Sequence, residues 1–232
     1  AFERYPNEIA EYRSLAKELK MPESTIVINE YATMEGCGVP GILIRYIANM
    51  EENKVYACLP FWHQANNLND LAADANEPNS AWWFYKWYAE MNGQLLSVSK
   101  ENTTAVGLNG IAAIDSAKAA ASVLFGGTDG ESTIVLKDLA KADGFKNVNK
   151  VNVKLQAAHF KGFLGAAEPE TLMEGVYELD GDHLVVDIAD MISSSGYRLV
   201  VTPAEDDADA IALKSGYSDI YEAERAELLG QA

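Results

Sequence analysis

The stretch STIVINEYATMEGCGVPG (24–41) decides how the rest of this sequence is interpreted. Its apolar run, TIVI at 25–28, has the composition of a strand buried on both faces, as strands of parallel sheets are. Asn29 and Glu30 follow at once, and a segment with glycine, cysteine and proline separates them from the next apolar run. A carboxylate therefore stands where a buried strand ends, in front of an irregular loop.

Helical and strand patterns alternate on both sides of this stretch. Residues 7–20 place five apolar side chains on one helical stripe before the stop signal of Pro22. The five are Ile9, Tyr12, Leu15, Ala16 and Leu19. Residues 41–50 and 80–91 predict two more helices, and 54–62 predicts a second buried strand. The order helix, strand, helix, strand, helix is typical of parallel βα units.

After Gly93 the pattern changes to short strands bounded by glycine, asparagine and aspartate. In the segment KVNVKLQ, Val151, Val153 and Leu155 alternate with polar neighbours, which indicates an antiparallel strand with one solvated face. Several such strands at short spacing predict a β-sandwich, which we place at 94–203.

The α/β portion, residues 1–93, is too small to cover both faces of a parallel sheet by itself. A closed eight-fold βα barrel needs about 250 residues. The portion is either a stand-alone layer packed on the sandwich or the last part of a barrel whose earlier strands are absent. The second alternative explains more of the pattern.

Composition and charge exclude several classes of function. The net charge of −17 disfavours nucleic acids and anionic membranes as partners. No apolar run is long enough to span a membrane. Two cysteines, Cys37 and Cys58, and three scattered histidines, His63, His159 and His183, predict no disulfide framework and no metal site. We expect both thiols to be free, Cys58 to be buried in its strand, and His159 and His183 to be structural.

The segments INEY and CLPFWHQANNLNDLAADANEPNSAWWFYKWYAEM, followed by a sandwich, resemble the C-terminal part of a glycoside hydrolase. The family is the large group of retaining (β/α)8-barrel enzymes with two catalytic glutamates. The resemblance implies an α/β plus all-β fold, in which the last two βα units of a TIM (β/α)8 barrel precede an antiparallel β-sandwich. It also implies hydrolysis of O-glycosidic bonds in poly- or oligosaccharides by double displacement.

Residue by residue, the resemblance places Glu30 at the end of strand seven as the nucleophile. Trp62 falls at the end of strand eight, where the family has an aromatic side chain in the sugar subsite. Asn29 and Tyr31 would hydrogen-bond near Glu30 and keep it ionised. The side chains with types suited to sugar hydroxyls are His63, Gln64, Asn66, Asn67, Asn69 and Asp70. No cofactor is expected for catalysis.

The partner acid/base ends strand four in this family, and neither Glu35 nor Glu77 occupies a matching position. We therefore expect the isolated chain to be inactive without the missing barrel segment of its parent protein. That segment and the carbohydrate substrate are the expected partners.

The last residues resemble the opening strand of a jelly-roll carbohydrate-binding module. YEAERAELLGQA (221–232) follows the acidic linker AEDDADA, so 204–232 is expected to be a linker with the first strand of such a module. In a complete module, Glu222 and Glu224 would help hold a structural calcium ion. The resemblance thus implies a secreted, multi-domain protein, extracellular or on the cell surface.

Alternatives remain for the site residues. Glu30 has the features of an ordinary strand-end carboxylate that caps the next helix or pairs with Arg45. The dipeptide Asn29–Glu30 could instead mark the acid/base of strand four, but only one further βα unit precedes the sandwich. Trp62 fits packing under the barrel rim as well as sugar stacking. The helix tryptophans are expected to fill a buried seam. They are Trp82, Trp83 and Trp87.

Two other classes of function compete with the hydrolase. One is a non-catalytic carbohydrate-binding or scaffold protein, in which the sandwich carries the ligand and the α/β portion only packs against it. The other is an enzyme on a doubly wound sheet, but neither strand is followed by a Gly-rich phosphate loop.

Overall fold

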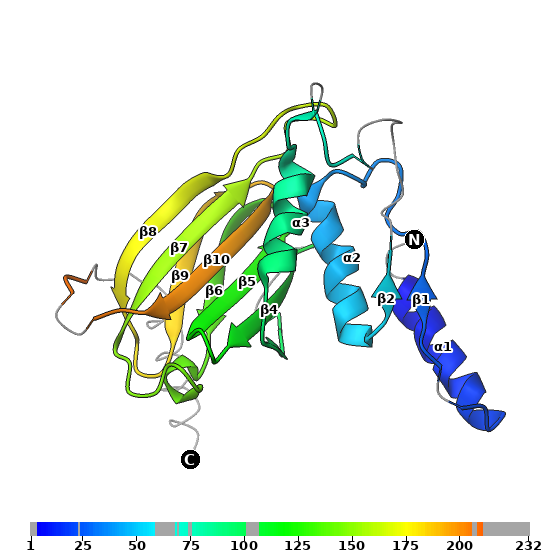
Figure 1. Cartoon of the computed structure of the whole chain (residues 1–232), viewed down its shortest axis with the longest axis horizontal. Helices are drawn as coiled ribbons and strands as arrows, with labels where there is room; N and C mark the ends of the chain where they lie inside the picture. The colour runs from blue at the N-terminus through cyan, green and yellow to red at the C-terminus, as the bar shows by residue number, and fades with distance from the viewer. Residues whose placement is uncertain are drawn as a thin grey trace, which may run out of the picture.

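The computed structural model describes residues 4–22, 24–58, 68, 70–73, 76–100, 107–205 and 208–210 (Figure 1). Its helices are α1 (Arg4–Glu18), α2 (Pro40–Asn53) and α3 (Ser80–Glu90), with a 3-10 turn at Leu139–Lys141. The strands of the N-terminal part are β1 (Val27–Ile28) and β2 (Tyr56–Ala57). The later strands are β3 (Gln94–Leu96), β4 (Asn109–Asp115), β5 (Ala120–Gly126), β6 (Gly130–Leu136), β7 (Lys150–Ala158), β8 (Glu170–Glu178), β9 (Leu184–Met191) and β10 (Gly196–Pro203).

The two short strands of the N-terminal part pair in parallel, as the βα pattern predicts. Val27 lies opposite Tyr56, and Ile28 lies opposite Ala57. Helix α2 connects them, and Ile26, Ile28 and Ala57 pack against the core cluster that contains its buried side chains. Its start is specified locally, because Pro40 occupies the first turn, where a missing backbone N–H costs nothing.

The C-terminal part consists of two antiparallel sheets. One sheet has six strands in the order β3-β4-β5-β10-β7-β8, and the other is the pair β6-β9. The structure is therefore a mixture of helices with parallel and antiparallel strands, which confirms the outline of the expected α/β plus all-β fold.

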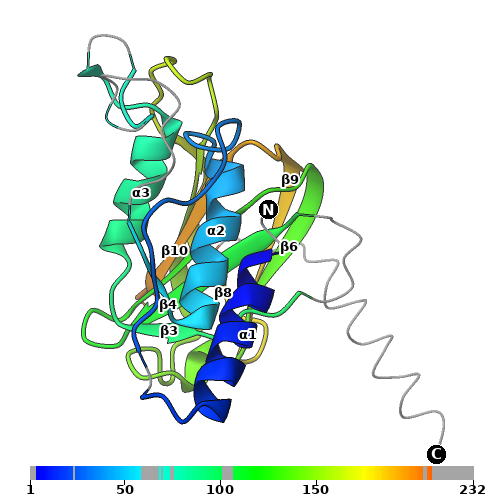
Figure 2. The same cartoon turned by 90° about the vertical axis from the view of Figure 1, so that its right-hand side faces the viewer.

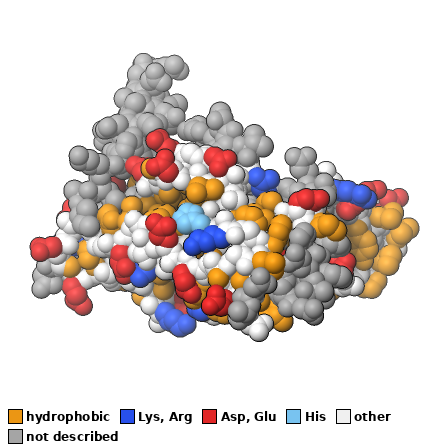
Figure 3. Space-filling view, turned by 90° about the horizontal axis from the view of Figure 1, so that it is seen from above, with side chains coloured by type: hydrophobic (Ala, Val, Ile, Leu, Met, Phe, Trp, Pro, Cys, Tyr) orange, Lys and Arg blue, Asp and Glu red, His pale blue; other side chains and the backbone are white. Residues whose placement is uncertain are grey.

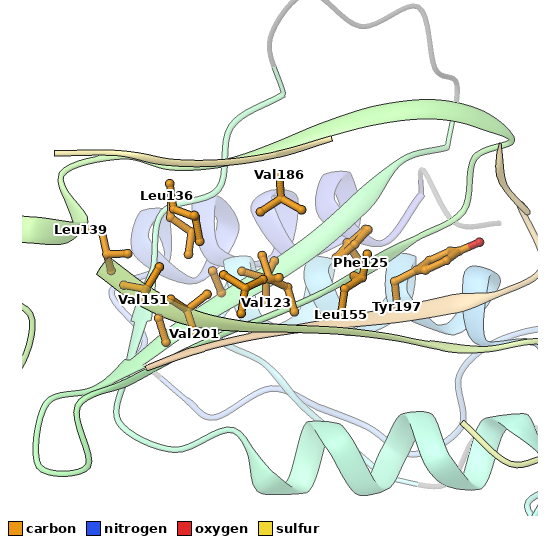
Figure 4. Close-up of a cluster of buried hydrophobic side chains, with 14 of the residues drawn as sticks. Val123, Phe125, Leu136, Leu139, Val151, Leu155, Val186, Tyr197 and Val201 are labelled. Carbon is orange, nitrogen blue, oxygen red and sulfur yellow. The ribbon is translucent and has the colours of Figure 1, made fainter. Parts of the chain in front are cut away.

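The two antiparallel sheets share one core (Figure 4). Every second residue of β7 points into this core. Val151, Val153 and Leu155 are almost completely buried, as their alternation with polar neighbours predicts. Phe125 of β5 and Tyr197 of β10 stack in the same layer with their ring centroids 5.4 Å apart. The strand pair β6-β9 closes this core opposite the six-stranded sheet, and its side chains Leu136 and Val186 point into it.

The opposite face of the six-stranded sheet packs on α2 and α3 (Figure 2). Ile111 of β4, Leu124 of β5 and Ala158 of β7 join the helix side chains in a second core. Phe84 and Trp87 of α3 are buried in this core. Side chains from both sides of residue 93 thus pack together, while the domain boundary itself stays a prediction.

Helix α1 departs from its expected packing. Only Ile9 of the predicted stripe is buried, whereas Leu15 and Leu19 are more than half exposed. Strands β1 and β2 are also more exposed than predicted, since Val27 is 52% exposed and Tyr56 is 70% exposed. The prediction that both strands are covered on both faces is therefore wrong for Val27 and Tyr56.

None of the helices in the described ranges combines the length and the apolar character needed to cross a membrane.

Candidate functional site

The candidate site lies at the end of the parallel strand pair. The backbone N–H of Tyr56 donates to the carbonyl of Ile26 at 3.0 Å, and that of Cys58 donates to Ile28 at 3.0 Å. Because parallel strands end at the same edge of their sheet, the segments that follow β1 and β2 start side by side there. Glu30 stands at this edge, two residues beyond the last residue of β1.

Glu30 faces solvent, as does Asn29. Within the described part of the chain, the Glu30 carboxylate makes no hydrogen bond or ion pair. The alternative partner, Arg45, instead donates from Nη2 to the carbonyl of Gly127 at 3.0 Å. Nor does Glu30 cap α2, since the residue at the N-cap is Val39 and no side chain caps it. The carboxylate is thus available at the strand edge.

Tyr31 points into the protein. It is buried, and its hydroxyl lies 2.6 Å from the hydroxyl of Tyr85 on α3. Its ring also packs on Tyr46 of α2 with the centroids 6.1 Å apart. Burial raises the pKa of Tyr31 and that of Tyr85, so both stay protonated near neutral pH. Tyr31 anchors the backbone next to Glu30, and its expected contact with substrate stays a prediction.

Asp70 was expected among the sugar-binding residues, and the structure places it elsewhere. Its side chain is fully buried, and Oδ2 accepts a hydrogen bond from the thiol of Cys37 at 3.1 Å. The side-chain amide of Asn79 donates to the backbone carbonyl of Asp70. Oδ1 of Asn79 accepts a hydrogen bond from the backbone N–H of Trp82 at the start of α3. Asp70 therefore joins the segment after β1 to the segment before α3, a contact that only the folded chain can bring about.

The remaining predicted substrate contacts lie outside the described residues. They are Trp62, His63, Gln64, Asn66, Asn67 and Asn69, and the same holds for the candidate calcium ligands Glu222 and Glu224. In the described ranges, His, Cys, Asp and Glu side chains form no group of three that could hold a metal ion.

The expectation that Cys58 is buried in its strand is wrong. Cys37 is fully buried, whereas Cys58 is exposed just past the end of the short strand β2. Burial, together with the hydrogen bond to Asp70, raises the pKa of Cys37 to about 12. A thiol in that environment is inert, because the thiolate is the reactive form.

We expect one fast-reacting thiol per chain. Ellman's reagent should modify Cys58 within minutes at pH 8 and reach Cys37 only after the protein is unfolded in guanidinium chloride. Cys58→Ser should abolish the fast phase, and Cys37→Ser should leave it unchanged. Two fast equivalents in the native protein would contradict the buried Cys37–Asp70 contact.

The tryptophans of α3 have three different environments. Trp87 is buried, as expected, and Trp83 is half-buried and donates from Nε1 to the carbonyl of Ala167 at 2.6 Å. Trp82 is 36% exposed and meets Trp83 edge to face with the centroids 4.8 Å apart. The prediction that all three fill a buried seam is therefore wrong for Trp82, which lies on the helix face turned to solvent.

A serine, a histidine and a glutamate meet at the ends of β7, β8 and β10. Nδ1 of His159 lies 3.0 Å from Oγ of Ser195, and Nε2 lies 3.3 Å from Oε2 of Glu170. Ser195 is only 1% exposed, so no substrate reaches its hydroxyl and the group is not a nucleophilic triad. His183 accepts the backbone N–H of Asp138. Both histidines are structural, as predicted.

No family model matches the chain. Two curated proteins do. One is a 3-O-α-D-galactosyl-α-L-arabinofuranosidase of Bifidobacterium longum subsp. longum, 33% identical over 223 residues, which cover 91% of this chain and 19% of that protein. The other is a 3-O-β-L-arabinopyranosyl-α-L-arabinofuranosidase of Bifidobacterium pseudocatenulatum, 32% identical over 209 residues, with 84% of this chain and 21% of that protein covered. The chain thus spans about a fifth of the length of these relatives.

Solved structures have the same fold. N2152 from Neocallimastix frontalis superposes with a TM-score of 0.73 at 30% identity, over 84% of this chain and 49% of that one. A glucosidase from Croceicoccus marinus superposes with a TM-score of 0.59 at 12% identity, over 85% of this chain and 50% of that one. A GH39 enzyme from Xanthomonas axonopodis pv. citri superposes with a TM-score of 0.57 at 9% identity, over 85% of this chain and 48% of that one. Over most of its length, the chain is therefore related to part of curated proteins that are named glycosidases.

Proposed function

We propose that this chain is the C-terminal part of a retaining glycoside hydrolase that acts on arabinofuranosyl-containing glycans, with Glu30 as its nucleophile. The observation that carries the proposal is the parallel pairing of β1 and β2, with an exposed glutamate two residues beyond the end of β1 that makes no ion pair with the described residues. The names of the two curated relatives supply the substrate class.

In this mechanism Glu30 attacks the anomeric carbon while a second carboxylic acid protonates the leaving oxygen. A covalent glycosyl-enzyme forms, and water activated by the second group then releases the sugar. The geometry requires the two carboxyl groups to be about 5–5.5 Å apart. Tyr31 supports the step by fixing the backbone next to Glu30 through its bond to Tyr85.

The two strands are, in this proposal, the last two of a (β/α)8 barrel, and the six-stranded sheet with β6-β9 is the sandwich that follows it. Further barrel strands would cover Val27 and Tyr56 and the exposed stripe of α1. Side chains of these further strands would also fill a groove of about 320 Å³ between α1 and β1. It is lined by Tyr5, Glu8, Ile9, Tyr12, Thr25, Ile26 and Ile28.

The same proposal extends to the rest of the protein. The boundaries at residues 93 and 203, a binding module that begins within 204–232 and uses calcium, and an extracellular or cell-surface location all belong to it. So does the substrate contact of Trp62, His63, Asn66 and Asn67.

The isolated chain should not hydrolyse p-nitrophenyl α-L-arabinofuranoside, whereas the intact parent protein should. The reason is that the acid/base belongs to an earlier barrel strand, so that only one member of the pair is present. The measurement is release of nitrophenol at equal molar concentrations, with circular dichroism to verify that the isolated chain is folded. Turnover by the isolated chain would contradict the missing acid/base, and an intact parent without activity on arabinofuranosyl-containing substrates would contradict the function itself.

A further inference from the structure

The connection between β7 and β8, residues 159–169, reaches across to the α/β part of the molecule. The backbone N–H of Ala167 donates to the carbonyl of Pro78 at 3.0 Å, and the Ala167 carbonyl accepts the indole N–H of Trp83. The amide of Asn79 donates to the carbonyl of Phe163 at 3.4 Å. Three hydrogen bonds therefore tie this connection, hereafter the rim loop, to the start of α3.

The rim loop also touches the segment that follows Glu30. Gly38 has a φ of +78°, and a Cβ at that position would lie 3.2 Å from Cδ1 of Phe163 and 3.1 Å from Cβ of Asp70. The Phe163 ring thus lies against the backbone that leads from β1 into α2. In Figure 1 the rim loop and the start of α3 meet at the upper end of the molecule, toward which β1 and β2 point.

The surface beside these contacts is apolar in part. Leu164 is 42% exposed and Trp82 of α3 is 36% exposed. Phe160 and Phe163 meet edge to face with the centroids 5.4 Å apart, and Lys161 between them faces solvent. Figure 3 looks down on this end and shows hydrophobic side chains among charged ones.

We propose that the rim loop and Trp82 bind sugar units beyond the linkage that is cleaved, so that the antiparallel part of the chain contributes directly to substrate recognition. The inference rests on the proposed function. Sugar rings present flat C–H faces that pack on aromatic and aliphatic side chains, and the exposed Lys161 offers a hydrogen-bond donor for hydroxyl groups.

Two features of the rim loop favour sugar binding over a role limited to joining the α/β part to the antiparallel part. Trp82 and Leu164 are exposed beside this junction, whereas Ala167 in the same loop is buried. The loop backbone is held in place by Pro78, Asn79 and Trp83 before any ligand arrives, which reduces the entropy lost on binding.

The test compares a short and a long substrate in the intact protein. Trp82→Ala and Leu164→Ala should each lower kcat/KM for an arabinofuranosyl-containing oligosaccharide by about tenfold, mainly through KM. Both should leave kcat/KM for p-nitrophenyl α-L-arabinofuranoside within about twofold of the wild type. Trp82→Phe should retain most of the oligosaccharide activity, because a flat ring remains. Leu95→Ala is the matched control, since Leu95 is 44% exposed and lies beyond the opposite end of α3.

The outcomes separate the two proposals. An equal loss on both substrates, or no loss on either, would overturn the role of the rim loop and leave Glu30 as the nucleophile. A wild-type protein that cleaves neither substrate would overturn both. Selective loss on the oligosaccharide in the two alanine variants, with Leu95→Ala unchanged, would support the inference.

Discussion

Replacing Glu30 by glutamine in the intact protein should lower kcat on an aryl arabinofuranoside by about 10⁴-fold or more, with little effect on folding. Removal of a nucleophile eliminates the covalent route, and losses of this size are typical for groups that act as a catalytic unit. Glutamine has nearly the same shape, and the Glu30 side chain makes no hydrogen bond or ion pair within the described residues that the change would break. The measurement is steady-state turnover, with thermal unfolding to compare the stability of the two proteins.

Glu35→Gln is the matched control. Glu35 is an exposed carboxylate in the segment between β1 and α2, so its replacement makes the same change in net charge close to the site. It should leave kcat within about twofold, because surface substitutions away from the chemistry have small effects. Equal losses in the two variants would point to a general electrostatic effect and would contradict a specific role for Glu30.

Azide distinguishes the two roles that a strand-end glutamate can have. If Glu30 is the nucleophile, azide enters the space left in Glu30→Ala, attacks from that face and gives a glycosyl azide of inverted configuration. If Glu30 is instead the acid/base, the covalent intermediate still forms from a substrate with a good leaving group, and azide then gives a product of retained configuration. We expect the inverted product, and the retained one would assign Glu30 to the competing strand-four role.

Local patterns in the sequence predicted which elements form. Alternation at Val151, Val153 and Leu155 fixes the buried face of β7, because side chains of a strand point to opposite sides at every step. The helical patterns at 41–50 and 80–91 likewise predicted helices where the structure has α2 and α3. Such signals depend only on neighbours in the chain.

Exposure and partners were harder to predict, because they depend on residues far away in the sequence. Tyr31 looks like a substrate contact next to Glu30, but its hydroxyl is engaged by Tyr85, 54 positions later. Asp70 has the type of a sugar ligand, but Cys37 and Asn79 hold it inside. The rim loop was missed altogether, since only the folded chain brings residues 159–169 beside α3. The one signal for it in the sequence is the pair of phenylalanines in a glycine-containing loop.

Gly196→Ala should destabilise the fold by about 3 kcal/mol or more. Gly196 begins β10 where the sheet meets both helices, and an added Cβ would lie 2.4 Å from Cδ2 of Phe84 and 2.7 Å from Cβ of Pro40. Phe84 is fully buried, so its ring cannot move aside without disturbing the second core. Urea unfolding followed by tryptophan fluorescence measures the change, because Trp87 lies in the same core.

Two further glycines separate steric overlap from backbone strain. Gly41→Ala should be as costly as Gly196→Ala, because its Cβ would lie 2.0 Å from the carbonyl oxygen of Ser193, a backbone atom in the turn before β10. Gly181→Ala should cost only about 1 kcal/mol, because its φ is +59° but nothing lies within 4 Å of the added Cβ. If all three variants lose the same stability, the helices and the sheet do not approach as closely as the structure has them. A large loss confined to Gly41 and Gly196 would instead show that these two positions hold the α/β part, and with it Glu30, at a fixed distance from the antiparallel part.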